Sequence, residues 1–339
     1  MRPILCTLSV LALSACWPED QPDALRVEGK TMGTTYHVTV VDGPDTLDAV
    51  QLSALVEETL AGVLAHVNNW DPTSEVSRFS ASDSTEPVQM SDDLATVMAE
   101  SMRIHALSGG VFDVTLAPLI DLWGFGPKKP GEPVPTDAEI AGALSTVGQS
   151  EYLVLDGHSL RKTIPGVTLN LSAIAKGYGV DAVGRAIEAA GGQRWLVEIG
   201  GDLASKGLNA ANEPWVIGVE RPDAASQTVQ VILPVSDLGM ATSGDYRNYF
   251  EQDGVRYSHI IDPTTGRPIT HGTASVTVLA DSGMTADGLA TALLALGEER
   301  ALPLAEAEGI AVMFITRKGE TFETATSSAF DALIASMKD

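Results

Sequence analysis

Apolar and polar residues alternate between Tyr36 and Val40, and this period of two predicts a β-strand. From 47 to 67 the apolar positions recur every three or four residues, which predicts an amphipathic helix. The same two patterns predict further helices over 91–107, 173–190 and 284–296, and further strands over 194–199, 215–219, 228–235, 254–261 and 273–280.

Turn residues separate the remaining segments. Residues 124–137 are rich in Gly and Pro and predict a surface loop, at the end of which Thr136 and Glu139 form a capping box for a short helix. Helices and strands are interspersed without strict βαβ alternation, which favours an α+β fold with a mixed or antiparallel sheet and packed helices. Two hairpins are predicted, over 151–170 with its turn at Asp156-Gly157 and over 310–326 with its turn at Lys318-Gly319.

The first residues predict export. Arg2 precedes an apolar run that ends at Leu13 and is too short to span a membrane core of about 30 Å, so it indicates a signal peptide. Leu13-Ser14-Ala15-Cys16 has the form of a lipoprotein signal, and the only other cysteine, Cys6, lies inside the apolar run. We therefore expect a signal peptide over 1–15, a tether over 16–27 lipidated at Cys16, and one domain over 28–339. An ordinary signal peptide with an accidental cysteine is the alternative.

This interpretation places the protein in the bacterial cell envelope, anchored by lipid to the inner or outer membrane and facing the periplasm. The net charge of −24 argues against a nucleic-acid partner, because no extended basic surface is available to neutralise phosphates. A phosphorylated small ligand remains compatible with this charge where acidic side chains hold a divalent cation.

Asp287 and Thr291 are spaced by four residues in a predicted helix, so a carboxylate and a hydroxyl can face one hard cation. Helix capping by Asp287 is the alternative. Lys176 lies near a predicted helix start and indicates an anion site, although a purely structural lysine fits equally well. His259 lies in a strand-like segment close to the Asp245 segment, where a structural and a catalytic histidine are both consistent with the pattern.

Several common catalytic motifs are missing from the sequence. There is no G-x-G-x-x-G after a predicted strand, no G-x-S-x-G and no H-E-x-x-H. An S-x-x-K match over 159–162 falls on a predicted hairpin strand rather than at the start of a helix, so we discount it as a catalytic motif.

Taken together, the stretches LSAIAKGY, IGGD, ATSGDY, SHIIDPTTG and TADGLATALLALG resemble the ApbE family of flavin transferases, and the similarity covers roughly residues 28–320. The resemblance implies an α+β fold of two lobes with FAD in the cleft between them. Asn170 and Ser80 depart from the family, which often has Asp and Asn at these positions. The resemblance implies that the Mg²⁺ ligands are Asp287, Thr291 and the Ala173 carbonyl, and that Lys176 contacts the pyrophosphate. It places along the flavin or adenosine Met32, Tyr36, Trp70, Glu75 and Asp245. His259 is the implied base, with Asp245 the next candidate.

The implied reaction is Mg²⁺-dependent transfer of FMN from FAD to a Thr or Ser hydroxyl of an acceptor protein. A phosphodiester forms and AMP leaves. The resemblance also implies that the acceptor is a subunit of a membrane redox complex. Two alternatives stay open: hydrolysis of FAD to FMN and AMP, and a non-catalytic lipoprotein that binds FAD.

Overall fold

The computed structural model describes residues 24–126, 134–222, 228–246, 248–319 and 321–337. The predicted signal peptide, Cys16 and most of the predicted tether lie outside the described residues, as does the middle of the 124–137 loop. These predictions therefore stay predictions.

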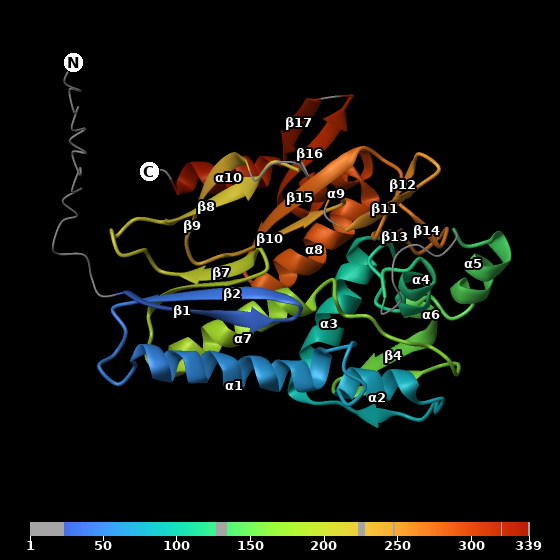
Figure 1. Cartoon of the computed structure of the whole chain (residues 1–339), viewed down its shortest axis with the longest axis horizontal. Helices are drawn as coiled ribbons and strands as arrows, with labels where there is room; N and C mark the ends of the chain where they lie inside the picture. Colours follow the sequence, from blue (N-terminus) through green and yellow to red (C-terminus); the bar gives the residue numbers. More distant parts are fainter. Residues whose placement is uncertain (1–23, 127–133, 223–227, 247, 320, 338–339) are drawn as a thin grey trace, which may run out of the picture.

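An eight-stranded sheet organises the molecule, and every neighbouring pair of its strands is antiparallel (Figure 1). The α+β class is confirmed, and the sheet is antiparallel rather than mixed. In spatial order its strands are β1 (Ala24–Thr31), β2 (Thr34–Val41), β6 (Arg194–Ile199), β7 (Asp202–Lys206), β10 (Gly239–Gly244), β15 (Thr273–Ala280), β16 (Ala311–Lys318) and β17 (Thr321–Thr326).

Helices cover one face of this sheet. They are α1 (Ala49–Val67), α3 (Asp92–Leu107), α7 (Ala175–Ala189) and α8 (Gly283–Leu296), with α2 (Glu75–Ala81) and α9 (Glu298–Glu308) beside them. α1 is long and apolar enough to cross a membrane by composition alone. It instead lies along the sheet and buries Leu52, Val56 and Leu60 against α7 and β2.

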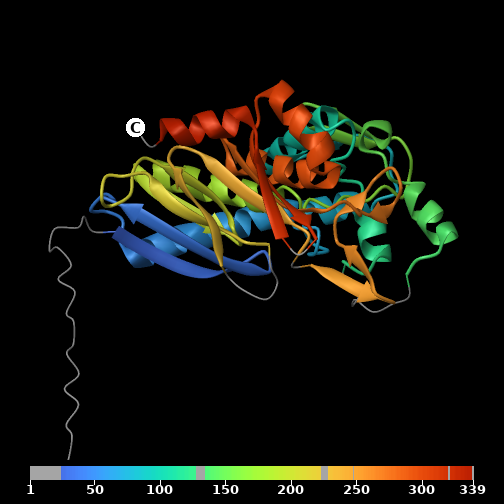
Figure 2. The same ribbon diagram turned by 90° about the horizontal axis from the view of Figure 1, so that it is seen from above.

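The opposite face carries the two-stranded pair β8 (Trp215–Glu220) and β9 (Val229–Val235) together with α10 (Ser328–Ser336), as Figures 1 and 2 show. Strand alternation explains this two-sided burial. Met240 of β10 faces the β8–β9 side, and its neighbour Ala241 faces the helices.

The smaller elements gather at one end. They are α4 (Ala117–Leu122), α5 (Asp137–Leu144), α6 (Gln149–Tyr152), β3 (Val88–Gln89), β4 (Leu153–Asp156), β5 (Ser159–Lys162), β11 (Tyr249–Gln252), β12 (Val255–Ser258), β13 (Ile261–Asp262) and β14 (Arg267–Pro268). A separate small core of Leu119, Trp123, Ile140 and Ile261 holds α4, α5 and β13 together.

Most predicted elements are confirmed. Strands 194–199 and 273–280 have the predicted bounds, and the turns of both hairpins lie where Gly157 and Gly319 adopt positive φ. The capping box of Thr136 and Glu139 is also confirmed.

The single strand predicted over 254–261 is wrong. β12 ends at Ser258, and Ile261 then pairs with Pro268 in another sheet. His259 therefore occupies a connection between two strands rather than a position within one.

Candidate active site

A cavity of about 630 Å³ opens where the amino end of α7, the middle of α8 and the β6–β7 turn meet. β8, β10, the connection after β12 and the segments around 111–120 and 170–173 form the rest of its wall. Its volume lies within the usual range of small-molecule sites. Part of its lining is apolar and able to pack against a planar ring: Val111, Phe112, Leu116, Ile120, Ile260 and Ile261.

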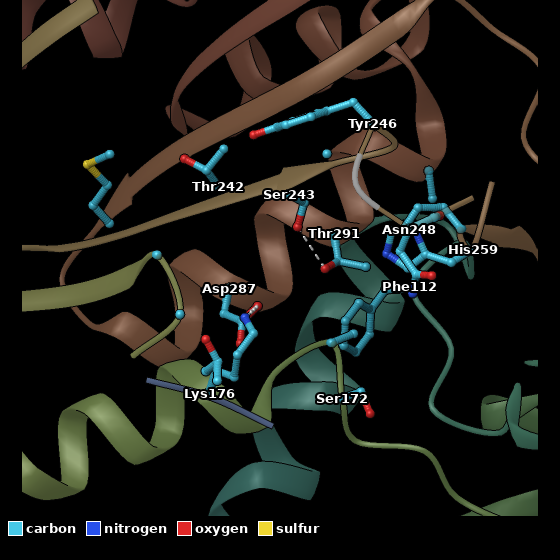
Figure 3. A pocket seen from close by; sticks show the side chains of 18 of the residues that line it. Phe112, Ser172, Lys176, Thr242, Ser243, Tyr246, Asn248, His259, Asp287 and Thr291 are labelled. Carbon is cyan, nitrogen blue, oxygen red and sulfur yellow. Dashed lines mark hydrogen bonds and ion pairs between the residues drawn. The ribbon is translucent and has the colours of Figure 1, made fainter. Parts of the chain in front are cut away.

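The partly exposed ammonium of Lys176 meets two buried carboxylates, those of Asp202 and Asp287, at one side of this cavity. Lys176 donates to the carboxylate of Asp202, and its Nζ lies 3.7 Å from Asp287 Oδ1 (Figure 3). Asp287 is 3% exposed and also accepts a hydrogen bond of 3.0 Å from the Gly177 amide. Burial opposes the charge on Lys176, but the two carboxylates outweigh it and raise the pKa of the ammonium. Lys176 is therefore a fixed cation facing the cavity.

Asp202 is a site residue that sequence reasoning missed. Its segment, the IGGD stretch at the β6–β7 turn, is visible in the sequence, but nothing there indicated that the carboxylate points back at Lys176. Burial, together with repulsion from Asp287, raises the pKa of the Asp202 carboxyl to about 7, and Lys176 opposes this shift. Two carboxylates thus share one ammonium.

Ala173, Asp287 and Thr291 all line the same cavity. The Thr291 hydroxyl lies 3.0 Å from the hydroxyl of Ser243, a residue of the ATSGDY stretch to which the sequence assigned no role. Among the described residues, no cluster of three or more His, Cys, Asp or Glu side chains could hold a metal ion. A hard cation here would therefore rely on one carboxylate and neutral oxygens, a donor set that Mg²⁺ accepts because it usually keeps several waters.

His259 lies across the cavity from the Lys176–Asp287 pair in the view of Figure 3. Its Nδ1 is 2.9 Å from the carbonyl oxygen of Asn248. A carbonyl only accepts, so we assign the proton of the neutral imidazole to Nδ1, which leaves Nε2 as a free acceptor. Burial lowers the pKa of His259, and Lys176 acts in the same direction, while the Asn248 carbonyl and Asp245 oppose them.

Asp245 does not line the cavity. Its carboxylate receives two hydrogen bonds from Arg317, of 2.8 and 2.6 Å, in a bidentate arrangement. Because both carboxylate oxygens are engaged by Arg317 and the residue lies outside the cavity, Asp245 is a weak alternative to His259.

The other four residues that the resemblance placed along the ligand are not among those that line the cavity. Tyr36 is 2% exposed and packs in the core beneath α1. Glu75 accepts hydrogen bonds from Ser91 at the start of α3. Met32 packs near Gly179 of α7, and Trp70 is exposed in a turn after α1. The structure thus brings Ala173, Lys176, His259, Asp287 and Thr291 to one cavity and leaves Met32, Tyr36, Trp70, Glu75 and Asp245 outside it.

The fold and this site define an α+β protein with a cavity that brings together a lysine ammonium, a buried carboxylate and an imidazole, a set of groups suited to a phosphorylated ligand. Comparisons with known proteins identify the family. Residues 32–314 match the ApbE family. The FAD:protein FMN transferase of Vibrio cholerae is 44% identical over 336 residues, covering 99% of this chain and 100% of that protein. The Haemophilus influenzae FAD:protein FMN transferase is 42% identical over 97% of this chain and 96% of its own length.

Solved structures give the same result. The flavin transferase ApbE of Vibrio cholerae superposes with a TM-score of 0.85 at 43% identity, over 92% of this chain and 99% of that one. The apo form of Pseudomonas stutzeri flavinyl transferase ApbE gives 0.86 at 40% identity, over 94% and 99%. The chain belongs to the ApbE family.

Proposed function

We propose that this protein transfers FMN from FAD to a Thr or Ser hydroxyl of an acceptor protein, with Mg²⁺ bound in the cavity. The observation that carries the proposal is the convergence of Lys176, Asp287, Thr291 and His259 on one cavity of a chain that matches the transferases over its whole length.

In the proposed reaction, each side chain at the cavity has one role. The acceptor oxygen attacks the flavin-side phosphorus, the P–O bond to the AMP leaving group breaks, and the hydroxyl proton passes to Nε2 of His259. A hydroxyl is a weak nucleophile at neutral pH, so a base within reach is needed. Lys176 binds the pyrophosphate oxygens through its fixed charge, and Asp202 holds that ammonium in place.

Asp287, Thr291 and the Ala173 carbonyl would hold the Mg²⁺, since all three border the cavity and offer oxygen donors. When bound, the ion neutralises pyrophosphate charge that would otherwise repel the nucleophile.

FAD hydrolysis and FAD storage are the rival functions. AMP release from FAD and Mg²⁺, with and without acceptor, separates all three. A transferase releases AMP in proportion to the acceptor supplied, a hydrolase releases it regardless, and a storage protein releases none. AMP release that ignores the acceptor would refute the proposal.

We further propose that the protein works at the bacterial envelope, lipidated on Cys16 and facing the periplasm. The lipoprotein-like segment Leu13-Ser14-Ala15-Cys16 supports this, as does a sequence without any cysteine after Cys16. An acceptor in a membrane redox complex is consistent with such an anchor.

A further inference from the structure

Apolar side chains on the outer face of the β8–β9 pair are open to solvent, and the face becomes charged at Glu220, which the register places opposite Val229. Val216 is 64% exposed, Ile232 is 65% exposed and Val229 is 53% exposed. The register places Val216 opposite Pro234 and Gly218 opposite Ile232, so these four share one face of the pair. A Cβ on Gly218 would lie 3.2 Å from the Val229 side chain, so Val229 covers Gly218 on that same face. We call these five residues the outer strip.

The residues of the outer strip are not part of the hydrophobic core. The residues that alternate with them, including Val219, Leu233 and Val235, are buried against the main sheet and already form a hydrophobic cluster there. None of the five is charged, although the chain as a whole carries −24. Uncharged apolar side chains grouped in this way on an acidic protein are typical of a surface that a protein partner covers.

The outer strip is continuous with the active-site cavity. Ile217, Gly218, Val219 and Glu220 of β8 all line the cavity. Side chains of consecutive strand residues point to opposite faces, so four in a row can border a cavity only where the strand presents its edge. β8 pairs with β9 alone among the described strands. Gly218 belongs both to this edge and to the outer strip, so a protein seated on the strip reaches the mouth of the cavity.

We propose that the outer strip docks the acceptor protein through an apolar surface flanking the Thr or Ser that receives FMN. This inference rests on the proposed function, which requires a macromolecular substrate to deliver a hydroxyl into the cavity. If the outer strip instead bound a second copy of the chain or a membrane surface, the acceptor protein would have no apolar contact beside the cavity. Docking through neutral side chains also spares the partner the cost of desolvating the carboxylates of an acidic surface.

The test compares Ile232→Asp and Val216→Asp with Val50→Asp. Val50 is 77% exposed on α1 and does not line the cavity, so its variant carries the same change in charge at an unrelated surface. The probe is the membrane fraction of cells that lack their own flavin transferase. The full-length wild-type chain attaches FMN covalently to the acceptor in this fraction, and the acceptor is then detected as a fluorescent band on a denaturing gel.

We expect the initial labelling rate at limiting fraction to fall about tenfold or more for both strip variants, the usual effect of disrupting an interface anchor, and to stay at the wild-type level for Val50→Asp. FAD affinity and melting temperature should not change in any of the three.

Unchanged labelling by Ile232→Asp and Val216→Asp would overturn the docking site while leaving the transferase intact. A wild-type dimer that these variants dissociate would instead assign the strip to self-association, and loss of binding to phosphatidylethanolamine–phosphatidylglycerol vesicles would assign it to the membrane. A wild-type chain that binds FAD but labels no band would refute the proposed function itself.

Discussion

Asp287 and Asp202 are both almost fully buried, and a single ammonium, that of Lys176, lies between them. A buried carboxylate needs a cation or hydrogen bonds to stay charged. Asp287 has one amide donor and a lysine that is bonded more closely to Asp202. This shortage of positive charge is what a bound divalent cation would relieve.

Asp287→Asn tests that interpretation while keeping the side-chain volume and an acceptor for the Gly177 amide. Mg²⁺-dependent AMP release should fall on the order of 10²-fold or more, because the metal would lose its charged ligand and be held by neutral oxygens alone. Mg²⁺ titration of the protein should show weaker binding, with FAD affinity nearly unchanged. Near wild-type turnover at saturating Mg²⁺ would show that Asp287 is not a metal ligand.

His259→Ala should lower transfer by a factor on the order of 10²–10⁴, the usual contribution of a positioned base. The active form is the neutral imidazole, which is lost as the pH falls through its pKa. Because burial lowers that pKa, the transfer rate should decline only below about pH 6.5, the ordinary value. The residual activity of the mutant should not show this decline at low pH.

A structural histidine gives another result for the same variant, namely a lower melting temperature with transfer per folded molecule nearly intact. Measuring the pH–rate profile and thermal stability on one preparation distinguishes the two roles.

Sequence motifs located Lys176, Asp287, Thr291 and His259, because these residues are polar exceptions in apolar surroundings. They could not locate Asp202, whose role depends on a contact across 26 positions of the chain. Tyr36 lies outside the cavity for a physical reason. In β2 it shares the buried face with Val38 and Val40, so its ring points toward α1.

At the scale of elements, the crossing of α7 and α8 sets the geometry of the site. Gly177 is the contact point: an added Cβ would overlap the Gly283 carbonyl and lie 2.8 Å from Asp287 Cβ. Only a residue without a side chain allows the two helices to approach this closely and lets the Gly177 amide reach Asp287.

Gly177→Ala should therefore lower the free energy of unfolding by about 1–3 kcal/mol through overpacking and should also reduce turnover, because it displaces Asp287. Gly62→Ala is the matched control. Gly62 is exposed in α1 with nothing near its Cβ position, so the change should stabilise the protein by about 0.5–1 kcal/mol. Denaturant unfolding and AMP release check both variants, and equal stability of the two would contradict the crossing argument.

Long periodic segments were predictable at this scale, and short or interrupted ones were not. α9 was missed because Pro303 lies inside it and its apolar positions are few. The strand over 254–261 was predicted as continuous because its residues favour a strand. Tertiary pairing of Ile261 with β14 nevertheless ends the local ladder and frees His259 for the cavity.

At the scale of the whole molecule, the proposed anchor decides where the reaction happens. Cys16→Ser should leave the precursor unprocessed by the lipoprotein peptidase, because the acylated thiol that marks the cleavage site is gone. Mass spectrometry of the wild-type protein should find acyl chains on Cys16 as the first residue. Wild-type protein that is soluble in the periplasm without an acyl mass would contradict this.

The whole-molecule claim of FMN transfer is tested most directly by stoichiometry in a single turnover. Enzyme in excess is mixed with limiting FAD, Mg²⁺ and the acceptor that wild-type protein labels, and AMP, free FMN and protein-bound FMN are measured together. We expect one AMP for each FMN recovered on a Thr or Ser of the acceptor, with negligible free FMN. AMP matched by free FMN in the presence of acceptor, or FAD recovered intact, would contradict the account.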